Sequence, residues 1–375
     1  MTMRSRPLVA SLLIAGSALA LGAVPGVQRT SLPDPLDVPT QPSEFASKGL
    51  TSGIARQGKQ LIAVGPRGLI MVSNDEAVTW KQVVSPVSSD LVSVKFTGEG
   101  SAWAIGHDAV ALHTSDSGAS WQKVLDGRSV LKLLRTTYTA RAKAGNAAAE
   151  ALLPEIERSV AQSATPDALP SPFLDVWFAD ASEGYLVGAF GLILHTTDGG
   201  KQWEPSIEQL DNPRSFHLYA VTGEGGERYI AGEQGLLLRL DAASRRFVKV
   251  ETPYAGTYFG LNLNGPRLVA FGLRGNAYVQ PTRGAAWNKI ETGVDAHIVA
   301  AVNLRDDQLM LVSQAGQVLA ISPDLRSTTV LKTPFMGEVL GAVASGPRRI
   351  ALARLNGVGA IEIGDNAAFE LPPIR

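Results

Sequence analysis

The 375-residue sequence contains no cysteine. This absence excludes disulfide bonds, thiolate metal sites and a cysteine nucleophile, and a chain without thiols is compatible with an oxidising compartment. Net charge is also nearly absent, at a formal −1, so the chain lacks the basic surface typical of nucleic-acid binding. The H-E-x-x-H zinc motif and the Walker phosphate loop do not occur. The hydrophobic fraction of 45% indicates a folded protein.

Long apolar runs are missing except at the start of the chain. Two arginines precede an apolar run from Pro7 to Val27, and Ala18-Leu19-Ala20 fits the small-x-small pattern that signal peptidase cleaves. We therefore expect residues 1–24 to be a signal peptide for export to the periplasm. A retained inner-membrane anchor is the alternative, because a bilayer span needs ~20 apolar residues. Residues 25–48 are rich in proline and polar side chains, which predicts an extended lead-in.

Tryptophans recur at a fixed period. Trp80 and Trp121 are 41 residues apart, and Trp203 follows after twice that distance. Alignment on this period gives seven units within residues 49–375, each with room for four short strands. Such a period is typical of a propeller, so we predict an all-β fold, a seven-bladed β-propeller. Short links such as Pro66-Arg67 join the second and third strands, and flanking glycines are expected to supply the left-handed backbone there.

One turn pattern, S/T-x-D-x-G-x-x-W, repeats before the tryptophans and decays in later units. The aspartate can accept backbone N–H bonds within its own turn, and the tryptophan can fill the gap between blades. This pattern is the Asp-box, or BNR repeat, and we interpret it as scaffold. Its residues are Asp75, Trp80, Asp116, Gly118, Trp121, Asp198, Gly200 and Trp203.

Asp-box blades of the form GLILHTTDGGKQW, behind a signal peptide and in a single domain of this length, resemble the photosystem II stability/assembly factor family. The resemblance covers about residues 50–372 and is strongest in the second and third units. It implies a non-enzymatic propeller without cofactor that helps to assemble a membrane protein complex from the exported side. That complex would be a photosystem in a phototroph, or an RND-type exporter in a non-photosynthetic bacterium. Nothing in the sequence marks a phototrophic host, so we expect a non-photosynthetic relative.

An Asp-box glycosidase or sialidase is the enzymatic alternative. The Arg-Ile-Pro element of sialidases does not occur, and Arg67 falls on a hairpin link, not on an inner strand. A glycosidase needs two carboxylates at a defined separation, whereas the expected inner strands offer chiefly Asp175, which could simply mark a strand start. His113 and His195 hold equivalent positions in two units, which the repeat explains as well as a metal pair would. We therefore predict neither a catalytic nor a metal site.

Between the second and third units, about one full period is inserted. Residues 127–170 carry no blade signature and place Val130, Leu134 and Tyr138 at helical spacing, which predicts a helical insertion interrupted near Gly145 and at Pro154. Two helices with paired charges would form a simple cap, a docking element would bind a partner, and a third alternative is membrane-surface binding. Because the insertion lies outside the blade pattern, we expect the propeller to tolerate its deletion.

These patterns predict binding in place of catalysis. We expect a monomeric accessory or assembly factor for a membrane protein complex, with no membrane span after signal removal; a small ligand in the central channel is the alternative. The insertion and the links between second and third strands are expected on one face. The partner-binding candidates there are Arg67, His107, Arg135, Tyr138, Arg141, Phe190, Gln234 and Arg274.

Overall fold

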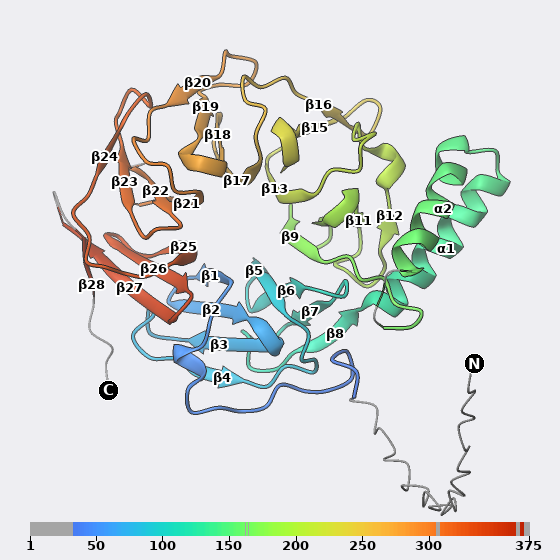
Figure 1. Cartoon of the computed structure of the whole chain (residues 1–375), viewed down its shortest axis with the longest axis horizontal. Helices are drawn as coiled ribbons and strands as arrows, with labels where there is room; N and C mark the ends of the chain where they lie inside the picture. Colours follow the sequence, from blue (N-terminus) through green and yellow to red (C-terminus); the bar gives the residue numbers. More distant parts are fainter. Residues whose placement is uncertain (1–32, 162, 164, 305–307, 365–367, 371–375) are drawn as a thin grey trace, which may run out of the picture. The chain divides into compact units, whose positions relative to one another are not determined.

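Seven antiparallel sheets follow one another along the chain, each made of four consecutive strands. The computed structural model describes residues 33–161, 163, 165–304, 308–364 and 368–370. The predicted signal peptide, residues 1–24, lies outside the described residues. From Asp34 onward, the chain forms one unit, in which the sheets are the blades of a ring around a central channel (Figure 1). The predicted seven-bladed propeller is confirmed.

The first three blades precede and follow the insertion. Blade one is β1 (Gly53–Gln57), β2 (Gln60–Gly65), β3 (Leu69–Ser73) and β4 (Lys81–Val83). Blade two is β5 (Leu91–Gly98), β6 (Ser101–Gly106), β7 (Ala111–Thr114) and β8 (Gln122–Leu125). Blade three is β9 (Phe173–Phe178), β10 (Gly184–Gly188), β11 (Ile193–Thr196) and β12 (Glu204–Pro205).

The other four blades repeat the same meander. Blade four is β13 (Leu218–Glu224), β14 (Glu227–Gly232), β15 (Leu237–Asp241) and β16 (Arg246–Lys249). Blade five is β17 (Tyr258–Asn264), β18 (Arg267–Gly272), β19 (Ala277–Gln280) and β20 (Asn288–Ile290). Blade six is β21 (Ile298–Asn303), β22 (Leu309–Ser313), β23 (Val318–Ile321) and β24 (Thr328–Val330). Blade seven is β25 (Val339–Gly346), β26 (Arg349–Arg354), β27 (Gly357–Ile363) and β28 (Ala368–Glu370).

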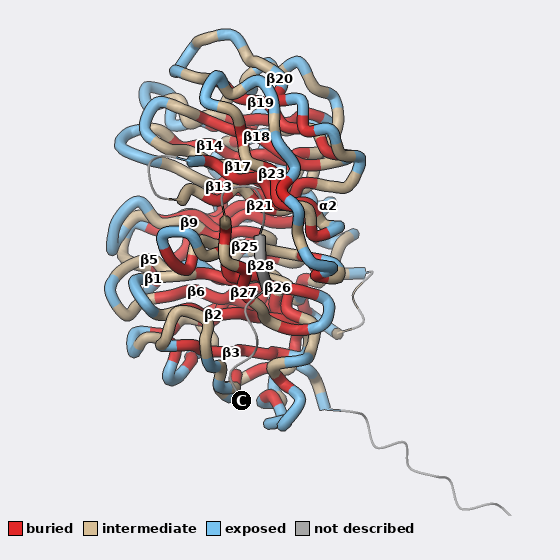
Figure 2. Tube along the Cα trace, turned by 90° about the vertical axis from the view of Figure 1, so that its left-hand side faces the viewer, coloured by how far each residue is buried: buried red, intermediate tan, exposed pale blue. Residues whose placement is uncertain are grey.

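Second strands are apolar throughout because neighbouring blades cover both of their faces. In β2, every residue after Gln60 is buried, and one apolar cluster joins Ile62 and Val64 of blade one to Ala102 and Ala104 of blade two. Figure 2 shows burial along the strands and exposure in the loops at both edges of the ring. Such apolar burial between sheets is the main stabilising contribution to the ring.

The ring closes without strand exchange, because all four strands of blade one and of blade seven come from consecutive chain. The Thr51 backbone N–H donates to the Arg354 carbonyl at 3.0 Å, and the Arg354 N–H donates to the Thr51 hydroxyl at 3.0 Å. Ile54 of blade one packs in a cluster with Ala351 and Ala353 of blade seven. Side-chain packing and hydrogen bonds such as these therefore hold the junction.

Two helices, α1 (Gly127–Lys143) and α2 (Ala147–Ala161), form the insertion between β8 and β9 and lie outside the ring beside blade three (Figure 1). The predicted helical insertion is confirmed, and the break falls at Gly145, whose φ is 89°. The expected interruption at Pro154 is wrong, since Pro154 lies inside α2. A proline removes only one backbone hydrogen bond, and α2 retains its packing against α1 through buried Ala149 and Ile156.

The described part of the lead-in packs on the ring and is not simply extended. Its residues form turns and a 3₁₀ helix, η1 (Ala46–Lys48). Leu36 is buried between blades one and two, and the Thr40 hydroxyl donates to the Gly68 carbonyl at 2.8 Å. Within the described ranges, none of the helices is both long and apolar enough to cross a membrane.

Candidate functional site on the tip-and-connector face

The two faces of the ring carry different loops. One face holds the first-to-second turns and the Asp-box turns between third and fourth strands, and we call it the Asp-box face. The other face holds the hairpin tips between second and third strands, the connectors between blades and the start of each inner strand. We call this the tip-and-connector face.

Asp-box carboxylates are occupied by their own turns. Asp116 accepts hydrogen bonds from the Ser120 hydroxyl at 2.6 Å, the Ser120 N–H at 2.9 Å and the Thr114 hydroxyl at 2.7 Å. The Ser120 donors, followed by Thr114, lower the pKa of Asp116 to about 2. Asp75 and Asp198 accept equivalent backbone N–H bonds at 2.8 and 2.9 Å. The three carboxylates thus stabilise the link between third and fourth strands.

Tryptophans of the Asp-box lie between blades. Trp203 of blade three is buried and packs edge-on against Trp103 of blade two, with ring centroids 5.5 Å apart. Gly200 has a φ of 84°, and a Cβ at this position would overlap Trp103. Two properties therefore favour glycine at this position: the left-handed backbone conformation and the lack of room for a side chain.

The first two units show the same arrangement. Trp121 is buried between blades one and two, and its indole N–H donates to the Gly118 carbonyl at 3.2 Å. Gly118 has a φ of 80° and abuts Ile62 of blade one. Trp80 is only half-buried and packs on the cluster shared by blades one and seven. The scaffold interpretation is consistent with all of these contacts.

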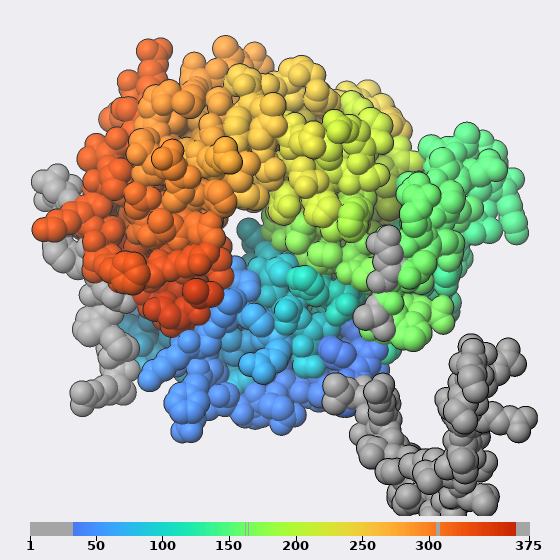
Figure 3. Space-filling view, in the orientation of Figure 1, coloured from blue at the N-terminus to red at the C-terminus, as the bar shows by residue number. Residues whose placement is uncertain are grey.

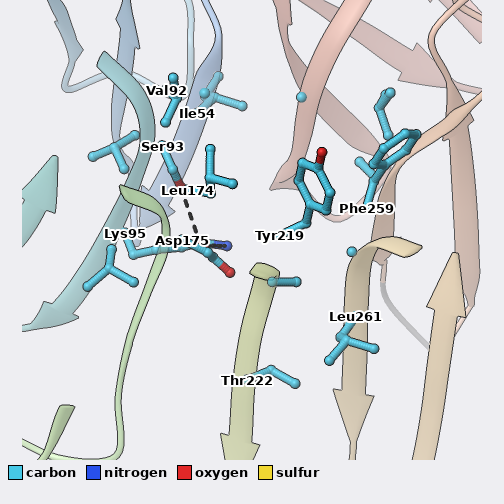
Figure 4. Close-up of a pocket in the computed structure, with 18 of the residues that line it drawn as sticks. Ile54, Val92, Ser93, Lys95, Leu174, Asp175, Tyr219, Thr222, Phe259 and Leu261 are labelled. Atoms are coloured by element: carbon cyan, nitrogen blue, oxygen red, sulfur yellow. Dashed lines mark hydrogen bonds and ion pairs between the residues drawn. The ribbon is translucent and has the colours of Figure 1, made fainter. Parts of the chain in front are cut away.

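Asp175 lies within β9 on the channel wall, and not at the strand start. Its carboxylate accepts from the Val221 N–H at 3.0 Å and from the Ser93 hydroxyl at 3.4 Å, and it pairs with Lys95 at 3.7 Å. The close-up in Figure 4 shows Asp175 between Ser93 and Lys95. Asp175 and Lys95 are the charged residues among the described channel lining. A glycosidase carboxylate pair is therefore not assembled in the described channel.

His113 and His195 each pack on a cross-strand aromatic ring. His113 lies 4.7 Å from the Trp103 ring and His195 lies 4.4 Å from the Tyr185 ring. Burial lowers the pKa of both imidazoles. Their sites lie on third strands of different blades, and the described residues contain no group of three or more metal-ligating side chains. Repeat equivalence accounts for the pair.

The channel has an apolar mouth on the tip-and-connector face. The channel has a volume of about 400 Å³, and the space-filling view shows a hollow at the ring centre (Figure 3). The second residue of six inner strands forms the mouth and is apolar in each case: Val92, Leu174, Tyr219, Phe259, Val299 and Leu340. Figure 4 shows the rings of Tyr219 and Phe259 side by side.

Hairpin tips hold exposed side chains in a left-handed backbone. The φ angle is between 51° and 56° at Arg67, Phe190, Gln234 and Arg274. From the sequence we expected only the flanking glycines to adopt the left-handed conformation, but these tip residues adopt it as well. In blade two the equivalent left-handed residue is Asp108, at φ 55°.

His107 precedes Asp108 by one residue and is exposed at the same tip. Three tips are held by the following connector. The Arg67 N–H donates to Asp90 at 2.8 Å and the Arg274 N–H donates to His297 at 3.1 Å. The Phe190 N–H lies 3.5 Å from His217.

Several predicted docking residues of the insertion are engaged in contacts within this chain. Arg135 makes two hydrogen bonds to Glu157 of α2, at 2.7 and 2.6 Å, and Arg141 pairs with Glu208. Tyr138 is fully buried; its hydroxyl donates to Glu208 at 2.9 Å and accepts from the Ile207 N–H at 3.0 Å. Burial and the Glu208 charge raise the pKa of Tyr138. Tyr138 is therefore inaccessible to a partner, and the assignment of a docking role to it is corrected.

The insertion is also part of the core. Val130, Leu131 and Leu134 of α1 share one buried cluster with Phe173 and Leu192 of blade three. The expectation that the propeller tolerates deletion of the insertion is therefore replaced: removal would expose this cluster. The spacing of apolar residues predicted the helices but could not show which neighbour they cover.

Large exposed apolar side chains gather on the tip-and-connector face. Among the described residues, all six occur in the lead-in before blade one or in the hairpin tips, connectors or a strand end at this face: Phe45, Val84, Phe190, Val330, Phe335 and Leu355. Phe335 is 94% exposed and Phe190 is 56% exposed. Apolar side chains concentrated on one face are typical of an interaction surface.

A row of aromatic rings connects the Phe190 tip to the channel mouth. Phe190 lies 4.6 Å from His217, which lies 6.2 Å from Tyr219. Tyr219 packs edge-on against Phe259 at 5.5 Å, and Phe259 lies 5.6 Å from His297. Sequence reasoning missed Tyr219, Phe259 and the connector histidines. Their repeat positions, at the start of the inner strands, were the available signal.

A family model matches part of the chain. The family described as Photosynthesis system II assembly factor YCF48 matches residues 163–253, which contain blades three and four. Photosystem II assembly lipoprotein Ycf48 of Synechococcus sp. (strain CC9902) is 43% identical over 65 residues, 17% of this chain and 20% of the relative. Photosystem II assembly protein Ycf48 of Synechococcus sp. (strain JA-3-3Ab) is 26% identical over 196 residues, 51% of this chain and 46% of the relative.

Solved structures share the fold at low identity. The structure titled "YCF48 bound to D1 peptide" has a TM-score of 0.60 and 14% identity, covering 85% of this chain and 95% of that chain. YCF48 from Cyanidioschyzon merolae gives 0.58 and 15%, covering 84% and 95%. PorZ of Porphyromonas gingivalis gives 0.55 and 13%, covering 86% and 38%. The sequence matches span at most about half of the curated relatives' length. The chain is therefore an Asp-box propeller that is similar, over the matched residues, to photosystem II assembly factors.

Proposed function

We propose that this propeller is a non-catalytic accessory factor that binds a polypeptide segment of a membrane protein complex through its tip-and-connector face. The observation that carries the proposal is the concentration of exposed apolar side chains on that face. The apolar channel mouth and the aromatic row from Phe190 extend the same surface inward. A protein partner with aliphatic or aromatic side chains fits such a surface.

Charges on the face favour an acidic partner segment. Arg67 and Arg274 are exposed, and neither has an ion-pair partner within the described part of the chain. Carboxylates nearby are engaged: Asp90 accepts from the Arg67 N–H, and Glu233 accepts from the His217 N–H at 2.8 Å. The free cationic donors therefore remain available to carboxylates of a partner, which arginine recognises well.

The relatives suggest which complex is involved. The curated relatives carry photosystem II assembly in their names, and one related structure is titled as bound to a D1 peptide. In a phototrophic host, the partner would be a photosystem II subunit, met on the exported side of the membrane. The RND-exporter alternative draws no support from these relatives. The pull-down described below tests this assignment, because it identifies the membrane protein that the propeller captures.

Charge reversal tests the proposal. The double variant R67E/R274E places two negative charges on the tip-and-connector face, and K59E/R326E makes the same change on the Asp-box face, where both residues are also exposed. We expect tagged R67E/R274E to lose its membrane-protein partner on purification from detergent-solubilised membranes, while K59E/R326E retains it. Equal retention by the two variants, with unchanged melting curves, would refute this docking face.

A further inference from the structure

The last residue before an inner strand contacts hairpin tips at three places in the ring. Asp90, His217 and His297 stand immediately before β5, β13 and β21. The backbone carbonyl of each accepts an N–H from the tip of its own blade, at 2.8, 3.3 and 2.7 Å. The side chain of each reaches back to the tip of the preceding blade. The three residues therefore hold one repeat position, which links neighbouring tips.

At two of the three places the side chain that reaches back is an imidazole. The Arg274 N–H donates to Nδ1 of His297 at 3.1 Å, and the Phe190 N–H donates to Nδ1 of His217 at 3.5 Å. The Phe190 and His217 rings also pack edge-on, with centroids 4.6 Å apart. A ring nitrogen that accepts an N–H does not carry a proton itself. The observed contacts therefore belong to the uncharged form of both histidines.

Protonation offers His217 a different partner. Its Nδ1 lies 3.3 Å from the Glu233 carboxylate, which already accepts from the His217 backbone N–H at 2.8 Å. A proton on Nδ1 turns this acceptor into a donor, so the charged ring bonds to Glu233 and releases the Phe190 N–H. Tyr219 of β13 and Arg214 of the connector are the other titratable or charged side chains of the surrounding elements, and neither bonds to the ring.

His297 has no such second partner. Within the described part of the chain, the histidines that lie within ion-pair distance of a carboxylate are His195 and His217. The His297 ring instead lies 5.6 Å from the ring of Phe259. The charged side chains of the surrounding elements are Arg274 at the tip, Asp295 in the same connector and Glu338, which bonds to the tip of blade six. A proton on Nδ1 of His297 therefore removes the acceptor of the Arg274 N–H and supplies no new bond.

Blade one provides the comparison within the same ring. At the equivalent position, the Asp90 carboxylate accepts from the Arg67 N–H at 2.8 Å. An aspartate carboxylate is ionised across the range of about pH 5–8 in which an imidazole changes its charge. Mild acidification therefore removes the acceptors at the tips of blades three and five, whereas the tip of blade one keeps its acceptor.

We propose that His217 and His297 are pH-sensitive latches of the docking surface. Uncharged, they fix the backbone of the Phe190 and Arg274 tips. Protonated, they release both tips, and the tip-and-connector face binds its partner more weakly. This consequence rests on the proposed function, because both tips belong to the proposed docking surface, but the latches can be measured without a partner.

Nuclear magnetic resonance of the ¹⁵N-labelled protein tests the latches alone. We expect the backbone amide resonances of Phe190 and Arg274 to titrate between about pH 8 and pH 5, while the amide resonance of Arg67 stays constant. H217N/H297N replaces each imidazole by a carboxamide whose oxygen accepts at every pH, so both titrations should disappear. Phe190 and Arg274 amides that do not respond to pH would overturn the proposal.

Partner capture tests the consequence. Purification from detergent-solubilised membranes at about pH 5.5 should yield roughly 3- to 10-fold less partner than at about pH 7.5, because the tip hydrogen bonds are lost. H217N/H297N, with an unchanged melting curve, should remove this difference. H107N makes the same substitution at an exposed histidine of the same face and should leave the difference intact.

The two readouts separate the two proposals. An H217N/H297N protein whose capture depends on pH as in the parent would overturn the regulatory role of the histidines. Titrating amides in a parent protein that captures no partner at either pH would support the latches and refute the docking face.

Discussion

Two fully buried tyrosines differ in the hydrogen bonding of their hydroxyl groups, and removal of each hydroxyl oxygen measures what those hydrogen bonds contribute to stability. Tyr138 and Tyr258 are both 0% exposed. The Tyr138 hydroxyl has two partners, Glu208 and the Ile207 N–H, at 2.9 and 3.0 Å. The Tyr258 hydroxyl has no hydrogen-bond partner in the described structure. Y138F and Y258F therefore remove the same atom from two different hydrogen-bonding environments.

The expected magnitudes follow from the partners left behind. Y138F leaves the partly buried Ile207 N–H without an acceptor, and a fully buried unsatisfied group costs about 1–3 kcal/mol. Glu208 loses the hydrogen bond from Tyr138 but keeps its ion pair with Arg141, so the Glu208 carboxylate is not left unpaired. We expect Y138F to lower the free energy of unfolding by about 2–4 kcal/mol. Y258F should be neutral or slightly stabilising, because it removes an unpaired buried hydroxyl.

Chemical denaturation measures both changes, and hydrogen exchange localises the first. Protection should fall in α1 and α2 of Y138F, because Tyr138 ties α1 to the segment around Ile207. In Y258F, exchange in the helices should match the parent protein. Equal destabilisation by the two substitutions would refute the reasoning. So would a Y138F protein whose helices remain as protected as before.

Three further predictions concern the scaffold. G200A should destabilise the protein by more than about 1 kcal/mol, because a Cβ would overlap Trp103, whereas G225A, at φ 58° with no atom within 4 Å, should cost less; thermal unfolding of both variants decides. The stability difference between the parent and D116A should be full above pH 3.8 and shrink as pH falls toward 2, because the folded pKa of Asp116 is depressed to about 2; a difference independent of pH in denaturant titrations would contradict the turn's role. Deleting residues 129–165 should lower the midpoint of unfolding, because α1 covers Phe173 and Leu192; an unchanged midpoint would restore the view of a separable insertion.

The sequence was most informative where a pattern repeats. Trp80, Trp121 and Trp203 predicted the blades because each must fill an equivalent gap, and the length of the step from Trp121 to Trp203 located the insertion. The repeat does not predict contacts that occur only once in the structure. The burial of Tyr138 depends on Glu208 and Ile207, which lie about 70 residues further along the chain, so no local spacing predicts it.

The same distinction applies to the candidate site. Arg67, Phe190 and Arg274 could be placed on one face because the hairpin between second and third strands recurs. Tyr219 and Phe259 lie in unremarkable apolar strand segments, and only the closed ring brings them together at the channel mouth.

Site-specific photocrosslinking tests the central claim most directly. A benzophenone amino acid in place of Phe190 samples the tip-and-connector face, and the same amino acid in place of Lys59 samples the Asp-box face. On irradiation of intact cells, we predict that a membrane protein of the assembling complex is crosslinked from position 190 and not from position 59. Crosslinking of that protein from position 59 alone would place the docking surface on the opposite face and contradict the account.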